Sequence, residues 1–131
     1  MPDPFDLSVS PPPLPLSVHA ESRGDAEIIA CEGSFAVKNH KRLDDLADVV
    51  LKSAARTVVI DMRKVVFMDS VGVGTLAMIC KHNFGGGKAL RLVPNDMVRR
   101  MLTLSCLDQV LPFFKDVDEA VTAPAKSQAA K

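Results

Sequence analysis

The fold is decided by the stretch TVVIDMRKVVFMDSVGVGTLAMICKHNF, residues 57–84. Its beginning, TVVIDM, is short, β-branched and bounded by charges, which is typical of a buried strand. Its end, from about Val71, is apolar on nearly all sides, which predicts a helix covered on two faces and packed against a sheet. Between these parts, Asp69 and Ser70 lie in a turn that follows the strand at residues 65–68. The stretch therefore predicts a strand, an Asp-Ser turn and a central helix.

The residues before this stretch predict a β-hairpin and an amphipathic helix. Residues 14–22 and 26–33 have the composition of strands and flank a turn at residues 23–25. That turn is an Arg-Gly-Asp triplet, which can indicate adhesion but at this position predicts a hairpin. One apolar stripe at helical spacing is then formed by Leu43, Leu46, Ala47, Val50 and Ala54.

The residues after this stretch predict two further strand–helix units. Phe84 and the glycines at residues 85–87 end the central helix, and residues 88–93 have the composition of a strand. Asn95 can cap the next helix. The apolar stripe of that helix consists of Val98, Met101, Leu102 and Ser105. A last short strand is expected at residues 111–116 and a last short helix at residues 117–123.

The predicted element order is β-β-α-β-α-β-α-β-α. Because each crossover must lay a helix on a face of the sheet, this order predicts an α/β fold with a mixed, mostly parallel β-sheet, an N-terminal β-hairpin and about four helices. One domain is expected to span residues 14–124. Residues 1–13 are rich in proline and are expected to form a flexible arm, and residues 125–131 are expected to form a flexible C-terminal tail.

Composition excludes several classes of protein. The 131 residues include 16 basic and 16 acidic side chains, so no global field draws the chain to nucleic acid or to an anionic membrane. The N-terminal residues do not resemble a signal peptide, and no run approaches the roughly 20 apolar residues of a membrane span, which predicts no membrane insertion. The odd, widely spaced Cys31, Cys80 and Cys106 disfavour disulfides and a zinc site, and predict a reducing, cytoplasmic location.

The sequence contains no convincing catalytic set. Residues 85–89, GGGKA, lack the hydroxyl residue of a phosphate-binding loop and join a helix to a strand, which is the wrong order. Ser70 does not lie in a nucleophile elbow, because Met68 occupies the position that requires glycine. No pattern places a histidine against Ser70. We therefore predict no enzyme, no cofactor and no metal site, and a serine hydrolase is the least favoured alternative.

The Asp-Ser turn allows two interpretations. Either Asp69 or Ser70 could cap the following helix, which is the ordinary role of these residues at such a position. Gly72 and Gly74, however, leave the first helical turn with little side-chain cover, so the backbone of another protein could approach closely. A hydroxyl at a helix N-terminus is also a suitable phosphate acceptor, because free amides and the helix dipole accommodate the added anion.

The chain resembles the STAS domain, the family of the bacterial anti-sigma factor antagonists. The resemblance covers about residues 14–123 and is strongest from Thr57 onward. The residues that carry it are Val58–Asp61, Phe67–Ser70, Gly72, Gly74, Gly86, Gly87, Val98–Leu102 and Leu107. The fold that this resemblance implies agrees with the element order predicted from the residues.

The resemblance also implies a function. In these antagonists, the serine directly after the aspartate is phosphorylated by an anti-sigma factor that is also a serine kinase. The unphosphorylated antagonist binds this kinase and frees a sigma factor, phosphorylation breaks the complex, and a serine phosphatase resets it. If this pattern applies to the present sequence, Ser70 would be the phosphoacceptor and Asp69 the acid that supports it. The protein would be a monomer or a weak dimer. The implied partner surface consists of Val71, Gly72, Val73, Gly74, Thr75, Lys38, Asn39 and His40.

The sequence departs from the antagonist pattern in several places. Many antagonists have Gly-Glu-Leu-Asp after the second strand, whereas here Ser34 and Ala36 replace the two acids. The residues that follow include Lys38, His40, Lys41 and Arg42. These could hold a phosphorylated Ser70, recognise a different partner or remain solvated. Cys106 stands where a helix-ending glycine is common. The alternative function is a constitutive, non-phosphorylated STAS adaptor in a signalling assembly or a membrane transport complex.

Overall fold

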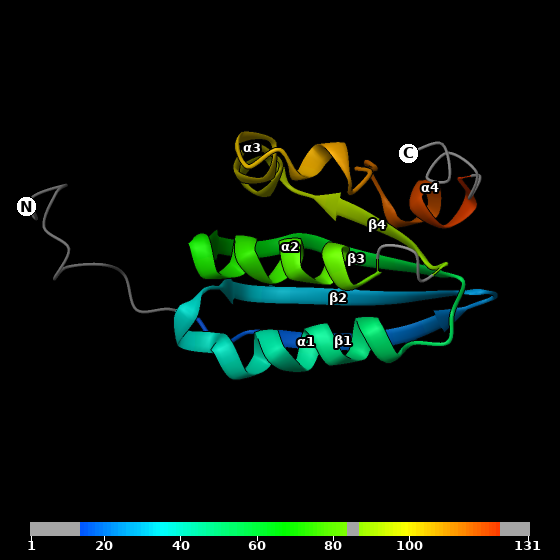
Figure 1. The fold of residues 1–131 in the computed structure, drawn as a ribbon, viewed down its shortest axis with the longest axis horizontal. Coiled ribbons are helices and arrows are strands. Elements are labelled where there is room, and N and C mark those ends of the chain that lie inside the picture. Colours follow the sequence, from blue (N-terminus) through cyan, green and yellow to red (C-terminus); the bar gives the residue numbers. More distant parts are fainter. Residues whose placement is uncertain (1–13, 84–86, 124–131) are drawn as a thin grey trace, which may run out of the picture.

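The computed structural model describes residues 14–83 and 87–123. Figure 1 shows a sheet with α1 and α2 along one face, while α3 and α4 lie on the side of β4. The strands are β1 (Ser17–Arg23), β2 (Ala26–Phe35), β3 (Thr57–Met68) and β4 (Ala89–Pro94). The helices are α1 (His40–Lys52), α2 (Ser70–Asn83), α3 (Asp96–Leu104), α4 (Val117–Thr122) and the short 3-10 helices η2 (Val37–Asn39) and η3 (Leu107–Gln109).

The strand order in the sheet is β1-β2-β3-β4, the same as in the sequence. β1 and β2 form the predicted antiparallel hairpin, in which Arg23 pairs with Ala26. The pairs β2–β3 and β3–β4 are parallel, so the predicted mixed, mostly parallel α/β fold is confirmed. Because β2 and β3 run in the same direction, they end side by side, where Phe35 pairs with Met68.

The strand predicted at residues 111–116 is wrong in extent. Only an isolated parallel bridge forms there, between Leu92 and Phe113. Leu92 N donates to Pro112 O at 3.0 Å, and Phe114 N donates to Leu92 O at 2.8 Å. Pro112 has no N–H for a longer ladder, and the chain then enters α4. The sheet of the described residues therefore has four strands, and the short helix predicted at residues 117–123 is present as α4.

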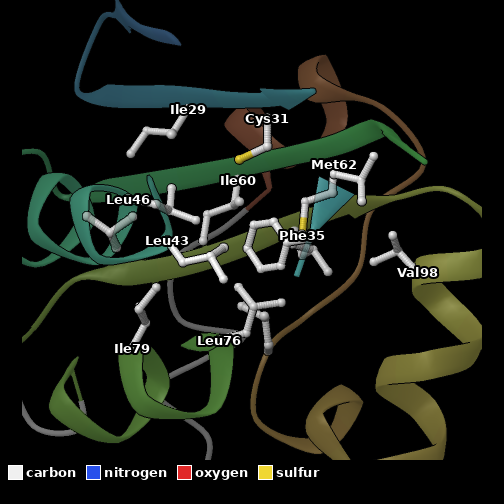
Figure 2. Close-up of a cluster of buried hydrophobic side chains, with 14 of the residues drawn as sticks. Ile29, Cys31, Phe35, Leu43, Leu46, Ile60, Met62, Leu76, Ile79 and Val98 are labelled. Atoms are coloured by element: carbon white, nitrogen blue, oxygen red, sulfur yellow. The ribbon is translucent and has the colours of Figure 1, made fainter. Parts of the chain in front are cut away.

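A large core lies between the sheet and the helices α1, α2 and α3 (Figure 2). The apolar stripe predicted on α1 is buried except at its last member, because α1 ends at Lys52 and Ala54 lies exposed beyond it. On α3, Val98 and Leu102 are buried, whereas Ser105 follows the helix and is exposed. Side chains that meet in this core include Ile29, Phe35, Leu43, Leu46, Ile60, Met62, Leu76 and Ile79.

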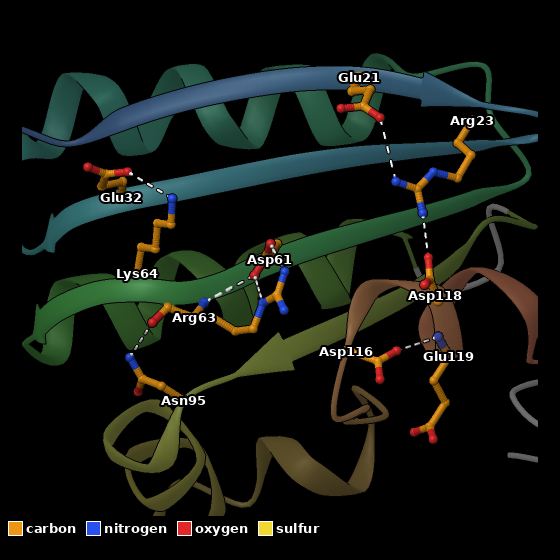
Figure 3. Close-up of polar contacts among 10 residues, drawn as sticks. All are labelled: Glu21, Arg23, Glu32, Asp61, Arg63, Lys64, Asn95, Asp116, Asp118 and Glu119. Atoms are coloured by element: carbon orange, nitrogen blue, oxygen red, sulfur yellow. Dashed lines mark hydrogen bonds and ion pairs between the residues drawn. The ribbon is translucent and has the colours of Figure 1, made fainter.

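Asn95 links β3 to α3. Its Oδ1 accepts from Val98 N at 2.9 Å, which confirms the predicted cap of α3. Its Nδ2 donates to Val65 O at 2.7 Å and to Arg63 O at 3.2 Å, and the bond to Arg63 is drawn in Figure 3. One side chain therefore fixes both the start of the helix and its position against the sheet.

The opposite face of the sheet has a smaller core, which α4 covers. Its buried members are Ile28, Val59, Val93 and Ala120. Arg91 of β4 is only 1% exposed. Its Nη1 donates to Ala120 O at 2.6 Å, and its guanidinium lies 5.6 Å from the centre of the Phe114 ring. Its Nε and Nη2 have no hydrogen-bond partner among the described residues, and burial lowers the pKa of Arg91.

Beyond α4, this face carries charged side chains (Figure 3). Arg63 pairs with Asp61 at 3.0 Å, and Arg23 of β1 reaches Asp118 of α4 at 2.8 Å. Because the Arg23 and Asp118 side chains are largely exposed, this link contributes little to stability. Among the described residues, the apolar packing on this face therefore lies beneath α4.

The three cysteines are free. Burial raises the pKa of the Cys31 thiol to about 12, with a smaller effect of the Asp61 carboxylate. Burial also raises the pKa of Cys80 to about 11. Both thiols therefore stay protonated near neutral pH and are poor nucleophiles. Cys106 is exposed and has a φ of 62°, the left-handed conformation that favours glycine.

Lys88 joins the start of β4 to the end of α1. Its Nζ donates to Val50 O at 2.9 Å and to Leu51 O at 2.6 Å, where the dipole of α1 favours a cation. We expect Lys88→Met to lower the free energy of unfolding by about 1 kcal/mol, because it removes both bonds but keeps an apolar stem.

The measurement is urea unfolding of both the variant and a matched control. Lys52→Met removes an exposed lysine from the last turn of α1, the turn to which Lys88 bonds. This control is expected to change the free energy of unfolding by less than about 0.5 kcal/mol. Equal losses in the two variants would show that the bonds of Lys88 do not stabilise the fold.

Several predictions concern residues outside the described ranges. The arm predicted at residues 1–13, the tail predicted at residues 125–131 and the residues 84–86 of the glycine-rich helix end lie there. Within the part of the chain that is described, no helix is both long and apolar enough to cross a membrane.

Candidate functional site

The turn between β3 and α2 is organised by the carboxylate of Asp69. Its Oδ1 accepts from Val71 N at 3.0 Å and from Gly72 N at 3.1 Å. Its Oδ2 accepts from Val37 N at 3.0 Å. Because α2 begins at Ser70, Asp69 is the residue that caps the helix. The same carboxylate joins the start of α2 to η2.

Ser70 occupies the first position of α2 and is exposed. Its hydroxyl has no hydrogen-bond partner within residues 14–83 and 87–123. The amides of Val71 and Gly72 are already bonded to Asp69, so the expectation of free amides at this terminus is wrong at these two positions. A phosphate on Ser70 would therefore add negative charge next to a carboxylate instead of filling an empty anion site.

The two glycines of α2 have different surroundings. A Cβ on Gly72 would lie 2.1 Å from Phe35 O and 2.8 Å from Phe35 Cδ2. Gly72 is buried, and its small size allows α2 to approach the end of β2. A Cβ on Gly74 would meet nothing within 4 Å, and Gly74 is exposed. The predicted open surface therefore includes Gly74, whereas Gly72 has a packing role.

The remaining predicted residues of α2 divide in the same way. Val71 is exposed, while Val73 and Thr75 are half-buried. The Thr75 hydroxyl donates to Val71 O at 2.9 Å, and Val73 packs against the large core. Next to Ser70, the accessible part of α2 is thus formed mainly by Val71 and Gly74.

The loop after β2 is fixed by Asn39. Its Nδ2 donates to Ser34 O at 2.8 Å and to Leu14 O at 2.9 Å. Asn39 is half-buried, and its amide serves the structure of the loop. The bond from Val37 N to Asp69 places this loop beside the Ser70 turn.

Four exposed basic side chains continue from this loop into α1. We call them the basic rim: Lys38, His40, Lys41 and Arg42. The rim lies at the start of α1, the positive end of the helix dipole, where cations disfavour the helix. Neither η2 nor α1 has an acidic residue in its first turn that would offset these charges. Arg42 approaches Asp45 at 3.8 Å, an exposed pair that contributes little. Lys38 and Lys41 have no ion-pair partner in the described chain.

Large apolar side chains are exposed near this loop, in η2, at the end of β3 and at the start of α2. The exposed fractions are 51% for Val37 of η2, 52% for Phe67 and 58% for Val66 of β3, and 38% for Val71. The strand expected at residues 65–68 is the end of β3, and its two middle residues, Val66 and Phe67, are exposed. The β2–β3 register shifts between Gly33 and Ser34, and this irregularity turns both side chains outward. The apolar letters alone did not reveal it.

A family model supplies the decisive comparison. The model of the STAS domain matches residues 17–120, which is most of the chain. The chain belongs to the STAS domain family. The family is regulatory and not enzymatic, in agreement with the expectation from the sequence.

Solved STAS structures show the same fold. An anti-sigma factor antagonist from Mycobacterium paratuberculosis is 23% identical over 82% of this chain and 92% of that chain, with a TM-score of 0.74. The Bacillus cell fate determinant SpoIIAA in its phosphorylated form is 18% identical, with coverages of 80% and 96% and a TM-score of 0.60. A sulfate transporter family protein from Wolinella succinogenes is 21% identical, with coverages of 99% and 100% and a TM-score of 0.67.

In this STAS domain, the two positions that often carry acids in antagonists are buried. Ser34 is 2% exposed and Ala36 is 3% exposed. Ser34 Oγ accepts from Leu14 N at 3.1 Å. A carboxylate at either position would be taken out of water, which is costly without a partner. Ser34 thus helps to hold the chain before β1.

Within the described residues of this STAS domain, the structure offers little support for a metal site or for a catalytic histidine near Ser70. Among residues 14–83 and 87–123, no group of three or more His, Cys, Asp or Glu side chains is placed to hold a metal. His82 lies near the far end of α2 from Ser70, with its Nδ1 3.0 Å from Met78 O. A polar hollow of about 440 Å³ includes Asp25 and Arg56, at the hairpin end of the sheet and away from the Ser70 turn.

Proposed function

We propose that this chain is an anti-sigma factor antagonist. In the unphosphorylated state it binds an anti-sigma factor that is also a serine kinase, phosphorylation of Ser70 releases it, and a serine phosphatase resets it. It regulates transcription indirectly in the bacterial cytoplasm, as a monomer or weak dimer without direct contact to nucleic acid. The observation that supports this most is the exposed hydroxyl of Ser70 at the start of α2, beside Asp69. This hydroxyl has no hydrogen-bond partner among the residues that the structure describes.

The proposed switch acts through charge. A phosphate adds about 1.5 to 2 negative charges at neutral pH. The nearby Asp69 carboxylate accepts three backbone N–H bonds, from Val37, Val71 and Gly72, so it cannot turn away without losing them. A partner surface that fits a neutral Ser70 would therefore meet two adjacent anionic groups after phosphorylation. Val71, Gly74, Lys38 and His40 are the exposed residues that such a partner would contact.

The likeness to other STAS structures gives this proposal further support. Two of the similar solved proteins are described as an anti-sigma factor antagonist and as SpoIIAA in a phosphorylated form. The Asp-Ser pair of the antagonist pattern is present here as Asp69 and Ser70, in the geometry of a capped helix with an exposed serine.

A second candidate keeps the fold and drops the switch. The chain would then be a constitutive STAS adaptor in a signalling assembly or a membrane transport complex. The likeness to a sulfate transporter family protein over 99% of the chain favours this alternative. The loss of the two acids that many antagonists carry, at Ser34 and Ala36, favours it as well.

A quantitative pull-down from lysate of the source organism tests the proposal. The baits are wild type, Ser70→Ala, Ser70→Asp and Ser22→Asp, since Ser22 is an exposed serine of β1 at the hairpin end of the sheet. We expect a kinase-like protein on all baits except Ser70→Asp, whose retention should fall at least ten-fold, or about 1.4 kcal/mol. We also expect the retained kinase to phosphorylate wild type and not Ser70→Ala.

Equal retention by all four baits would reject the switch and support the adaptor. Loss of binding with both aspartate variants would indicate a general effect of added negative charge, and would also reject a role specific to Ser70.

A further inference from the structure

We propose that the N-terminal segment Asp3–Leu7 of this chain docks on the basic rim beside Ser70 and competes there with other ligands of this surface. The docking itself does not depend on the proposed function. Only its consequence for partner binding rests on the proposed function.

The chain enters the domain next to this surface. Leu14 N donates to Ser34 Oγ at 3.1 Å, and Leu14 O accepts from Asn39 Nδ2 at 2.9 Å and from Ser34 N at 3.4 Å. Asn39 is the last residue of η2, directly before His40 of the rim. The segment before Leu14 is therefore joined to the domain next to the rim.

The charges of the two parts are complementary. Residues 1–13 contain Asp3 and Asp6 and no lysine, arginine or histidine. The rim presents exposed cations at the positive end of α1, and the lysines Lys38 and Lys41 are not paired with an acid in the described part of the chain. The exposed acids of α1, Asp44, Asp45 and Asp48, follow the rim along the helix, and Asp45 lies near Arg42. The first turn of α1 thus remains basic.

The apolar residues are complementary too. Phe5 and Leu7 flank Asp6 in the sequence. Val37 is 51% exposed between Ala36 and Lys38, and Leu14 is 52% exposed where the chain enters. An acidic segment with apolar anchors would cover apolar side chains that stay exposed beside cations with no acid partner among the described residues.

The connecting chain is long enough for this docking. Leu7 and Leu14 are seven residues apart, which at about 3.3 Å per residue spans up to about 23 Å. A short tether gives an effective concentration in the millimolar range. An intrinsic dissociation constant of about 1 mM, typical of a weak ionic and apolar contact, would therefore leave the surface about half occupied. Docking of this kind is reversible and can be displaced by a tighter partner.

Docking of this segment would couple to the state of Ser70. The segment and a phosphate are both anionic, so modification of Ser70 would repel Asp3 and Asp6 from the rim. In the unmodified state, the segment would compete with a partner for the same exposed residues. At half occupancy, such competition weakens partner binding about two-fold.

The test is a set of ¹⁵N–¹H correlation spectra of the full chain at low and high salt. The variants are Asp3→Lys/Asp6→Lys, Lys38→Glu/Lys41→Glu and the quadruple exchange that combines them. We expect both double variants to shift the amides of Val37, Ser70 and Val71, to the positions that wild type reaches in high salt. In the quadruple variant these amides should return toward their low-salt wild-type positions, because the ion pairs are restored with opposite sign.

Superimposable spectra of wild type and Asp3→Lys/Asp6→Lys outside residues 1–13 would overturn the docking. So would additive shifts in the quadruple variant. The pull-down reports separately on the proposed function. If the spectra show docking but Ser70→Asp retains the same proteins as wild type, the docking stands and the phospho-switch falls.

Discussion

Gly72→Ala is expected to lower the free energy of unfolding by about 3 kcal/mol. The added Cβ would lie 2.1 Å from the backbone oxygen of Phe35 and 2.8 Å from its ring. The oxygen cannot move independently, because it belongs to the end of β2 and accepts from Asp69 N at 3.3 Å. The start of α2 would therefore have to shift away from the sheet, with loss of the packing around Leu76.

Gly74→Ala is the matched control, two residues along the same helix. A Cβ there would meet nothing within 4 Å, and alanine favours a helix over glycine by about 1 kcal/mol. We expect the stability of this variant to rise by about 0.5 to 1 kcal/mol in urea unfolding. If both alanine variants were destabilised equally, the close approach of α2 to Phe35 would be wrong.

Asp69→Ala is expected to lower the free energy of unfolding by about 2 kcal/mol, since it removes a helix cap and a charge-assisted link to η2. Three backbone N–H groups, those of Val37, Val71 and Gly72, would lose their acceptor. Because Val37 directly precedes Lys38, the same change should release the loop that carries the start of the basic rim. Amide hydrogen exchange at Val37 should therefore accelerate together with exchange at Val71.

Asp69→Asn separates the two functions of this side chain. Its Oδ1 can still accept from the amides of α2, whereas an amide nitrogen in the place of Oδ2 cannot accept from Val37 N. We expect about half of the destabilisation, with faster exchange at Val37 but not at Gly72. Equal behaviour of the alanine and asparagine variants would contradict the bond between Asp69 and η2.

Much of the fold could be predicted because its signals are local. The hairpin depends on a turn of two residues, Gly24 and Asp25, between the paired Arg23 and Ala26. The burial of Leu43, Leu46 and Val50 follows from helical spacing. The Asn95 cap involves a residue three positions away. The strand at residues 111–116 failed because the apolar letters of Pro112 and Phe113 do not reveal that only one bridge to Leu92 forms. Its formation depends on how the chain turns into α4.

The candidate site could be predicted only in part, because several of its contacts join residues that are far apart in the sequence. The position of Ser70 follows from the Asp-Ser turn, which is local. The bond between Val37 and Asp69 joins residues 32 positions apart, and the close approach of Gly72 to Phe35 depends on how α2 packs against β2. Neither has a sequence pattern. The sequence pattern consequently placed Gly72 at the surface and did not indicate that Val37 and Phe67 are exposed.

Arg91 gives the domain an uneven distribution of stability. α4 has six residues, and it covers a guanidinium that makes one hydrogen bond to Ala120 O while two of its nitrogens remain without a partner in the described chain. When α4 detaches, water can hydrate these nitrogens, and the hydration offsets part of the apolar contact that is lost. Opening of this corner therefore costs less free energy than global unfolding. The residues of α4 form a segment of low local stability within an otherwise well-packed domain.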